Sequence, residues 1–216
     1  MRKYISLNSI FLFIIPIVTL LICLQIHVIY YELRSLPFID GEASVSLIGR
    51  QEKTITIFKT GLFLYAIISV FFYFSISEIF LSQKIKNKFK FYGIVANLSL
   101  CIYLFSLGKQ ESFYEISRRL SIILFIATMY INHIYLVKKL KFLKLTNRIH
   151  SSGKLFSIFY KIIFLMTILI IIGLPWVNPL FEYPHKLKNV IEWNLLFLTV
   201  IFYIPLSFLL YRLDTK

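Results

Sequence analysis

Seven polar or ionisable side chains interrupt the long apolar runs of this sequence, and their types decide which chemistry the chain can support. An acid, an imidazole or an amide is costly in hydrocarbon, so each is a candidate functional group. The alternative, which the sequence favours for any single one of them, is that such groups hydrogen-bond between helices or extend to the membrane interface. The seven are Gln25, His27, Glu32, Glu78, Asn97, Asn132 and His133.

The two histidines inside apolar runs, His27 and His133, are predicted to lie too far apart to bind one haem. The first predicted span runs outward and the fourth runs inward, so the imidazoles differ in depth by roughly 15 Å at about 1.5 Å per residue. The other histidines, His150 and His185, fall on opposite sides of the predicted membrane. We therefore expect no metal and no other cofactor.

Motifs of known intramembrane enzymes are missing from the sequence. It contains no Gly-x-Ser turn, no Cys-x-x-Cys, no His-Glu-x-x-His and no glycine-rich nucleotide motif. Cys23 and Cys101 both lie in apolar runs and are too few for a disulfide framework or a four-ligand zinc site. We therefore expect a protein that is not an enzyme.

The amino-acid composition indicates which class of protein contains these polar groups. Of 216 residues, 58% are hydrophobic and 16% are charged, whereas soluble domains have about 45–50% apolar and about 25% charged residues. Few glycines and prolines and 18% aromatic residues exclude disorder and collagen. A multi-pass integral membrane protein remains.

Six apolar stretches of about 20 residues can each cross a bilayer. They predict one all-α membrane domain, a six-transmembrane-helix bundle that covers residues 1–216. The first stretch is too long for a signal peptide, so we expect it to be retained as a signal anchor. The predicted spans are residues 9–31, 57–81, 89–107, 120–137, 155–176 and 190–211.

The net charge of +14 predicts an orientation rather than a nucleic-acid partner. Fourteen of the 24 Lys and Arg residues lie on the side of the two termini, nine lie on the other side, and Lys161 lies within the fifth span. By the positive-inside rule both termini are cytoplasmic. The basic segment 138–154 can also attract anionic lipid headgroups, although the topology signal alone accounts for its charge. Membrane lipids are thus the expected partners.

Two short motifs resemble the FRAG–DRAM–SFK family of six-helix membrane proteins. Leu36-Pro37-Phe38-Ile39-Asp40 follows the first span as the family's Pro-x-Ile-Ser-like segment does, with Asp40 in place of the usual Ser. Glu192-Trp193 opens the last span like the family's Glu-aromatic pair. The resemblance implies work on lipids, such as remodelling of lipid-anchored proteins, lipid retention at the plasma membrane, or autophagy at lysosomes.

The same two motifs suggest a lipid site. Pro37, Asp40, Glu192 and Trp193 share the predicted outer interface, where tryptophan prefers to lie. We predict that they frame an outward-facing groove between the first, fifth and sixth spans that accepts a lipid. The function predicted is non-enzymatic lipid handling or membrane organisation.

Two other functions stay open at this point. One is a lipid-remodelling enzyme with an unrecognised site. The other is a small-solute transporter or channel subunit whose polar path is lined by Gln25, His27, Asn97 and Asn132.

Overall fold

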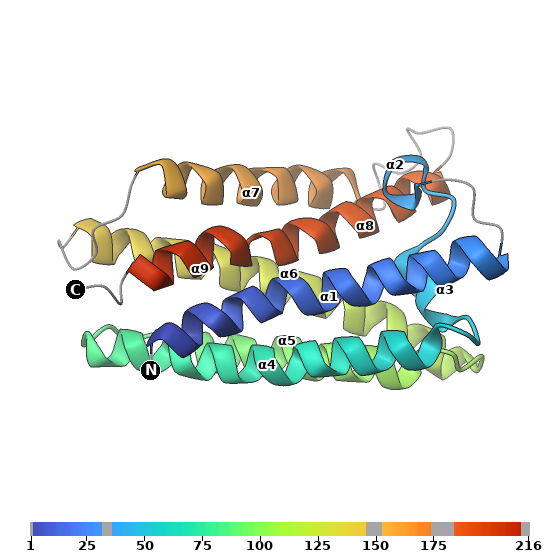
Figure 1. Cartoon of the computed structure of the whole chain (residues 1–216), viewed down its shortest axis with the longest axis horizontal. Coiled ribbons are helices and arrows are strands. Elements are labelled where there is room, and N and C mark those ends of the chain that lie inside the picture. The colour runs from blue at the N-terminus through green and yellow to red at the C-terminus, as the bar shows by residue number, and fades with distance from the viewer. Residues whose placement is uncertain (1, 32–35, 146–152, 174–183, 213–216) are drawn as a thin grey trace.

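The computed structural model describes residues 2–31, 36–145, 153–173 and 184–212, and within these residues every regular element is an α-helix. The long helices run side by side along the long axis of the molecule (Figure 1). Six helical segments are long and apolar enough to cross a membrane. The predicted all-α six-helix bundle is confirmed, and its orientation in the membrane stays a prediction.

The sixth predicted span consists of two helices, α8 and α9. The helix of the fourth predicted span, α6, is longer than the predicted residues 120–137 because it continues through the basic residues at both ends. The bounds of the spanning helices are α1 (Arg2–Tyr31), α4 (Ile55–Ser82), α5 (Phe89–Ser106), α6 (Ser112–Leu145), α7 (Gly153–Ile172), α8 (Pro184–Ile201) and α9 (Tyr203–Arg212).

Two short helices, α2 (Pro37–Asp40) and α3 (Val45–Arg50), connect α1 to α4 in the chain and lie at one end of the bundle, which we call the loop end, with α2 beside α8 (Figure 1). Pro37 begins α2, where its missing N–H costs nothing. Ser44 caps α3 by accepting a hydrogen bond from the Leu47 N–H at 3.0 Å. The opposite end, where α1 begins and α9 ends, is the terminal end.

The break between α8 and α9 follows from a proline. Pro205 has no N–H to donate to the Ile201 carbonyl, and its ring crowds that carbonyl, so the helix is interrupted one turn earlier, at Phe202. The Phe202 N–H still donates to the Leu198 carbonyl at 3.2 Å. The sixth span therefore passes through the bundle as two consecutive helices, α8 and α9, interrupted at Phe202.

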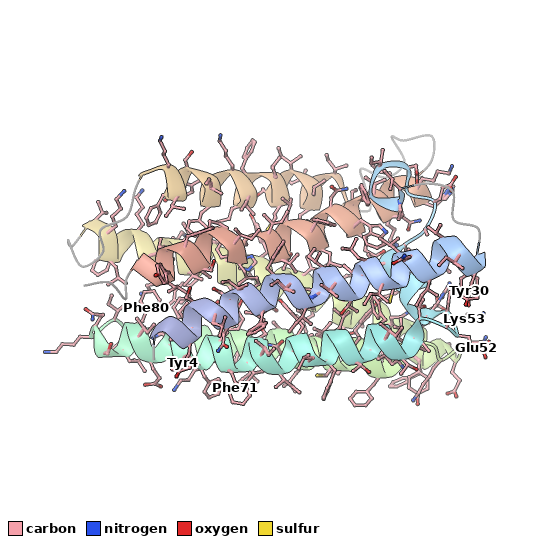
Figure 2. All side chains as sticks on the ribbon, viewed as in Figure 1. Tyr4, Tyr30, Glu52, Lys53, Phe71 and Phe80 are labelled. Atoms are coloured by element: carbon pink, nitrogen blue, oxygen red, sulfur yellow. The ribbon has the colours of Figure 1, made fainter. Side chains whose placement is uncertain are left out.

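Apolar side chains cover the outside of the bundle as well as its core. On α4, Phe72 is fully buried, whereas Phe71 is 64% exposed and points away from the other helices (Figure 2). Large apolar patches of this kind are rare on soluble proteins. Hydrocarbon is the solvent that suits such a surface, which fits a multi-pass membrane protein.

Two glycines let α4 approach its neighbours closely. A Cβ atom at Gly61 would lie 2.0 Å from the Thr19 Oγ1 of α1, and one at Gly93 of α5 would lie 2.6 Å from the Tyr73 Cβ of α4. Small residues at such crossings are a common device for packing membrane helices. They seat α1 and α5 against α4.

We expect Gly61→Leu to push α1 away from α4. Overpacking typically costs about 1–3 kcal/mol, which in a chain of this size lowers the melting temperature in detergent by roughly 3–10 °C. The control is Gly153→Leu, because a Cβ at Gly153 meets nothing within 4 Å. Equal melting temperatures for the two variants would contradict the helix crossing described here.

Candidate functional site

At the loop end, side chains of α8 hold the α2–α3 segment in place. Three N–H donors on two turns of α8 reach three backbone carbonyls of the segment, so these carbonyls of an irregular stretch are paired. The pairs are Asn189 Nδ2 to Gly41 O (2.8 Å), Trp193 Nε1 to Ala43 O (2.8 Å) and Asn194 Nδ2 to Phe38 O (2.9 Å). We call this contact the loop clamp.

Gly41 makes the loop clamp possible. Its φ angle of +69° lies in the left-handed region, and its N–H donates to the Pro37 carbonyl at 3.1 Å, which ends α2. A Cβ atom here would lie 2.1 Å from the Lys186 carbonyl oxygen. The two backbones therefore touch at a point where only glycine fits.

The four residues predicted to frame a lipid groove all lie at the loop end, on α2 and α8. Pro37 is buried, Trp193 is fully buried in the loop clamp, and the Asp40 carboxylate accepts the Glu42 N–H at 3.1 Å. Glu192 follows one residue before Trp193 on α8. Because the surfaces of Pro37 and Trp193 are taken up by packing within the protein, their contact with lipid stays a prediction.

Glu192 places a carboxyl group beneath α3. The backbone groups of Val45 and Ser46, at the start of α3, lie close to this carboxyl, and Lys188 lies one turn earlier on α8. Free N–H groups at a helix start favour a negative charge. The loop clamp thus covers an acidic side chain that enters the bundle.

A small cavity of about 30 Å³ lies below the loop clamp. The surface that it exposes is almost entirely apolar, although Glu192, Tyr103, Tyr65 and Thr199 are among the residues around it. A buried water needs two to four polar partners as well as room, so this lining suits an apolar void. The cavity therefore separates the half-buried Glu192 from the tyrosines deeper in the bundle.

Asn97 on α5 forms an interhelical hydrogen bond. Its Nδ2 donates to the Ser69 Oγ of α4 at 3.0 Å and to the Gly93 carbonyl of its own helix at 2.7 Å. Asn97 is 3% exposed. Asn97 therefore forms a hydrogen bond between helices, which is the structural role that a polar residue in a membrane span can have instead of a functional one.

Asn132 and His133 on α6 lie fully inside the bundle. The His133 ring stacks on Phe202, with centroids 3.9 Å apart and planes 13° apart. In the part of the chain that the structure describes, no protein atom forms a hydrogen bond of good geometry with either side chain, although the Asn132 amide lies near the Tyr73 hydroxyl. Unpaired polar atoms at this depth are costly.

The other predicted polar residues lie elsewhere. Gln25 is exposed on the outside of α1, and His27 is buried against Tyr31 with ring centroids 4.7 Å apart. Glu78 pairs with Lys90 of α5, and Glu32 lies outside the described residues. Because Gln25 faces away from the bundle, it does not line an internal path.

The buried tyrosines are not among the polar residues that the sequence analysis singled out. Tyr73 and Tyr203 share a hydrogen bond between hydroxyls 2.8 Å apart, and Tyr65 is likewise 2% exposed. A signal was available, since Tyr65, Ser69, Tyr73 and Ser77 repeat every four residues and so fall on one face of a helix.

A shallow, open groove of about 780 Å³ runs along α7 toward the terminal end, and its described lining residues all belong to α7 itself. At the end of the groove nearer the loop end, the Tyr130 hydroxyl of α6 lies 2.6 Å from the Thr167 Oγ1. Lys141 and Lys144 of α6 reach the rings of Tyr160 and Phe156, at 5.8 and 5.2 Å. The groove is lined by Gly153, Phe156, Ser157, Tyr160, Lys161, Ile163, Phe164 and Thr167.

Comparison of the chain with models of protein families, with curated proteins and with solved structures gives no match. The FRAG–DRAM–SFK resemblance therefore stays a prediction, and the function is argued from the geometry above.

We expect Trp193→Phe to loosen the loop clamp while keeping an aromatic ring in place. Leaving the buried Ala43 carbonyl unpaired costs about 1–3 kcal/mol, so amide hydrogen exchange in residues 38–50 should accelerate by roughly tenfold. The matched control is Tyr130→Phe, which removes the hydroxyl contact to Thr167 in another part of the bundle. Unchanged exchange in residues 38–50 of Trp193→Phe would contradict the loop clamp.

Proposed function

We propose that this protein is a non-enzymatic, multi-pass membrane protein that binds anionic lipids along α7. The observation that supports the proposal is the groove on α7 with its basic rim. An aromatic and aliphatic floor suits an acyl chain, and lysines at one end suit a phosphate. Lipid handling is also what the family resemblance implies.

The position of Lys161 is the strongest part of this case. It lies on α7 about 12 Å from Gly153, at about 1.5 Å per residue, and its side chain is exposed in the groove. A lysine at that depth extends its ammonium group toward the interface or toward an anionic partner. The phosphate of a lipid seated in the groove would be such a partner.

Further lysines surround the same end of the groove. Lys141 and Lys144 approach it from α6, and Lys154 is exposed on the first turn of α7. Basic residues near a membrane surface contribute about 1 kcal/mol each toward anionic lipid. The charge and the shape of the groove both support a lipid with an anionic headgroup as the proposed occupant.

The loose packing of α7 fits an exchangeable lipid. Of the 20 residues of α7, the buried ones are Phe156, Phe159, Ile162 and Met166. The helix lies at one edge of the bundle, on the opposite side from α4 and α5 (Figure 1). A lipid can reach the groove from the bilayer without opening the core.

The proposal is tested by the lipids that stay bound to the purified protein. We expect native mass spectrometry to show retained phosphatidylglycerol in preference to phosphatidylcholine. Lys144→Gln combined with Lys161→Gln should lower that retention by roughly tenfold to thirtyfold.

The control removes the same charge at the loop end. Lys53 and Lys109 also lie over aromatic rings, Tyr30 and Tyr114, at 3.4 and 4.1 Å, and Lys53 and Tyr30 can be followed in Figure 2. Lys53→Gln combined with Lys109→Gln should leave lipid retention as in the wild type. Equal losses in both double variants, or equal retention of both lipids by the wild type, would overturn the proposal.

A further inference from the structure

One pair of lysines reaches the groove on α7 from the neighbouring helix α6. The Lys141 and Lys144 ammonium groups lie over the rings of Tyr160 and Phe156, at 5.8 and 5.2 Å from the ring centroids. Both rings line the groove. These contacts place the two lysines, which we call the α6 pair, along the side of the groove that faces α6.

A second pair of lysines lies on α7 itself. Lys154 and Lys161 are both exposed, and they are seven residues, or almost two helical turns, apart, so they project from one face of the helix. At about 100° per residue, the groove residues Gly153, Ser157 and Phe164 fall between this face and the side that faces α6. The groove is therefore bordered by lysines on both sides, and we call the second pair the α7 pair.

The two pairs border the same short stretch of the groove. The α6 pair lies beside the turn of α7 from Phe156 to Tyr160. Lys161 follows Tyr160 directly, and the side chains of a helix tilt toward its N-terminus, so the Lys161 ammonium group extends back toward the same turn. An anionic group on either side of the groove would thus meet a lysine at a similar depth.

Within the described residues, no carboxylate pairs with any of these four lysines. The ion pairs described there join Glu78 to Lys90 and Glu115 to Arg119. The sequence itself contains no Asp or Glu between residues 116 and 181. A lipid with one phosphodiester brings a single negative charge, so it would engage one pair and leave the other without an anion.

We propose, building on the function proposed above, that the groove selects a lipid with two phosphates joined by a glycerol, one phosphate at the α6 pair and the other at the α7 pair. Two phosphodiesters side by side match the two lysine pairs in number and in placement, and basic sites between membrane helices are suited to such headgroups. The open shape of the groove admits the several acyl chains of this lipid, which a closed pocket would exclude.

The test is native mass spectrometry of the purified full-length protein in detergent with equal amounts of cardiolipin, phosphatidylglycerol and phosphatidylcholine. Because the second phosphate engages a second lysine pair, we expect the wild type to retain cardiolipin over phosphatidylglycerol by roughly tenfold to thirtyfold. Lys141→Gln combined with Lys144→Gln should bring that ratio close to one, since the α7 pair alone binds one phosphate of either lipid. Lys154→Gln combined with Lys161→Gln should do the same from the other side.

The control removes two lysines at the same end of the bundle but outside the groove. Lys86 and Lys88 are exposed in the connection between α4 and α5, and Lys86→Gln combined with Lys88→Gln should keep the wild-type ratio. The two-phosphate site is refuted by a wild-type ratio near one, by an equal fall in the control, or by an unchanged ratio after loss of either pair.

Retention of phosphatidylglycerol in the same samples separates this site from anionic-lipid binding in general. A wild type that prefers phosphatidylglycerol to phosphatidylcholine, without preferring cardiolipin to phosphatidylglycerol, refutes the two-phosphate site and leaves the proposed function standing. A wild type that prefers neither anionic lipid refutes both.

Discussion

The hydrogen bond between Tyr73 and Tyr203 is the interaction around which the interior is arranged. Hydrocarbon offers no hydrogen-bond partner to a hydroxyl group. Because α4 has four hydroxyl-bearing residues on one face, that face must turn toward the interior of the bundle. This fixes the rotation of α4 about its axis and leaves Phe71 and its apolar neighbours outside. It also links α9 to α4 through their tyrosine side chains, just after the break that Pro205 causes, while α1 packs against both helices. Asn132 and His133 of α6 lie against the same region.

The loop clamp solves the related problem at the loop end. The α2–α3 segment has carbonyl groups that no helix satisfies, and α8 supplies donors for them from Asn189, Trp193 and Asn194. The clamp also covers Glu192, which otherwise lies at the mouth of the bundle. The proposed lipid groove lies on α7, on the opposite side of the bundle from α4 and α5 (Figure 1).

Composition and apolar run length were sufficient to predict the six spans, because hydrocarbon imposes a length and a polarity on every crossing helix. The structure places the motifs at Pro37 and Glu192 at the loop end, and the lipid groove expected between them stays a prediction. The loop clamp itself was not predictable, because a side chain that binds a backbone carbonyl leaves no pattern in the partner sequence. The buried hydroxyl groups of α4 were not predicted because tyrosine was counted as apolar. Their four-residue spacing is visible in the sequence at Tyr65, Ser69, Tyr73 and Ser77.

The inward rotation of α4 is tested most directly by spin labels placed one at a time along residues 61–80, after replacement of Cys23 and Cys101. Oxygen dissolves in the bilayer, so its collision rate with each label reports contact with lipid. The account predicts a rate that rises and falls with the helical period. A rate with no helical period, or one with its peaks and troughs exchanged, would contradict it. The predicted peaks are Phe63, Ile67, Phe71 and Phe74, and the predicted troughs are Tyr65, Ser69, Tyr73 and Ser77.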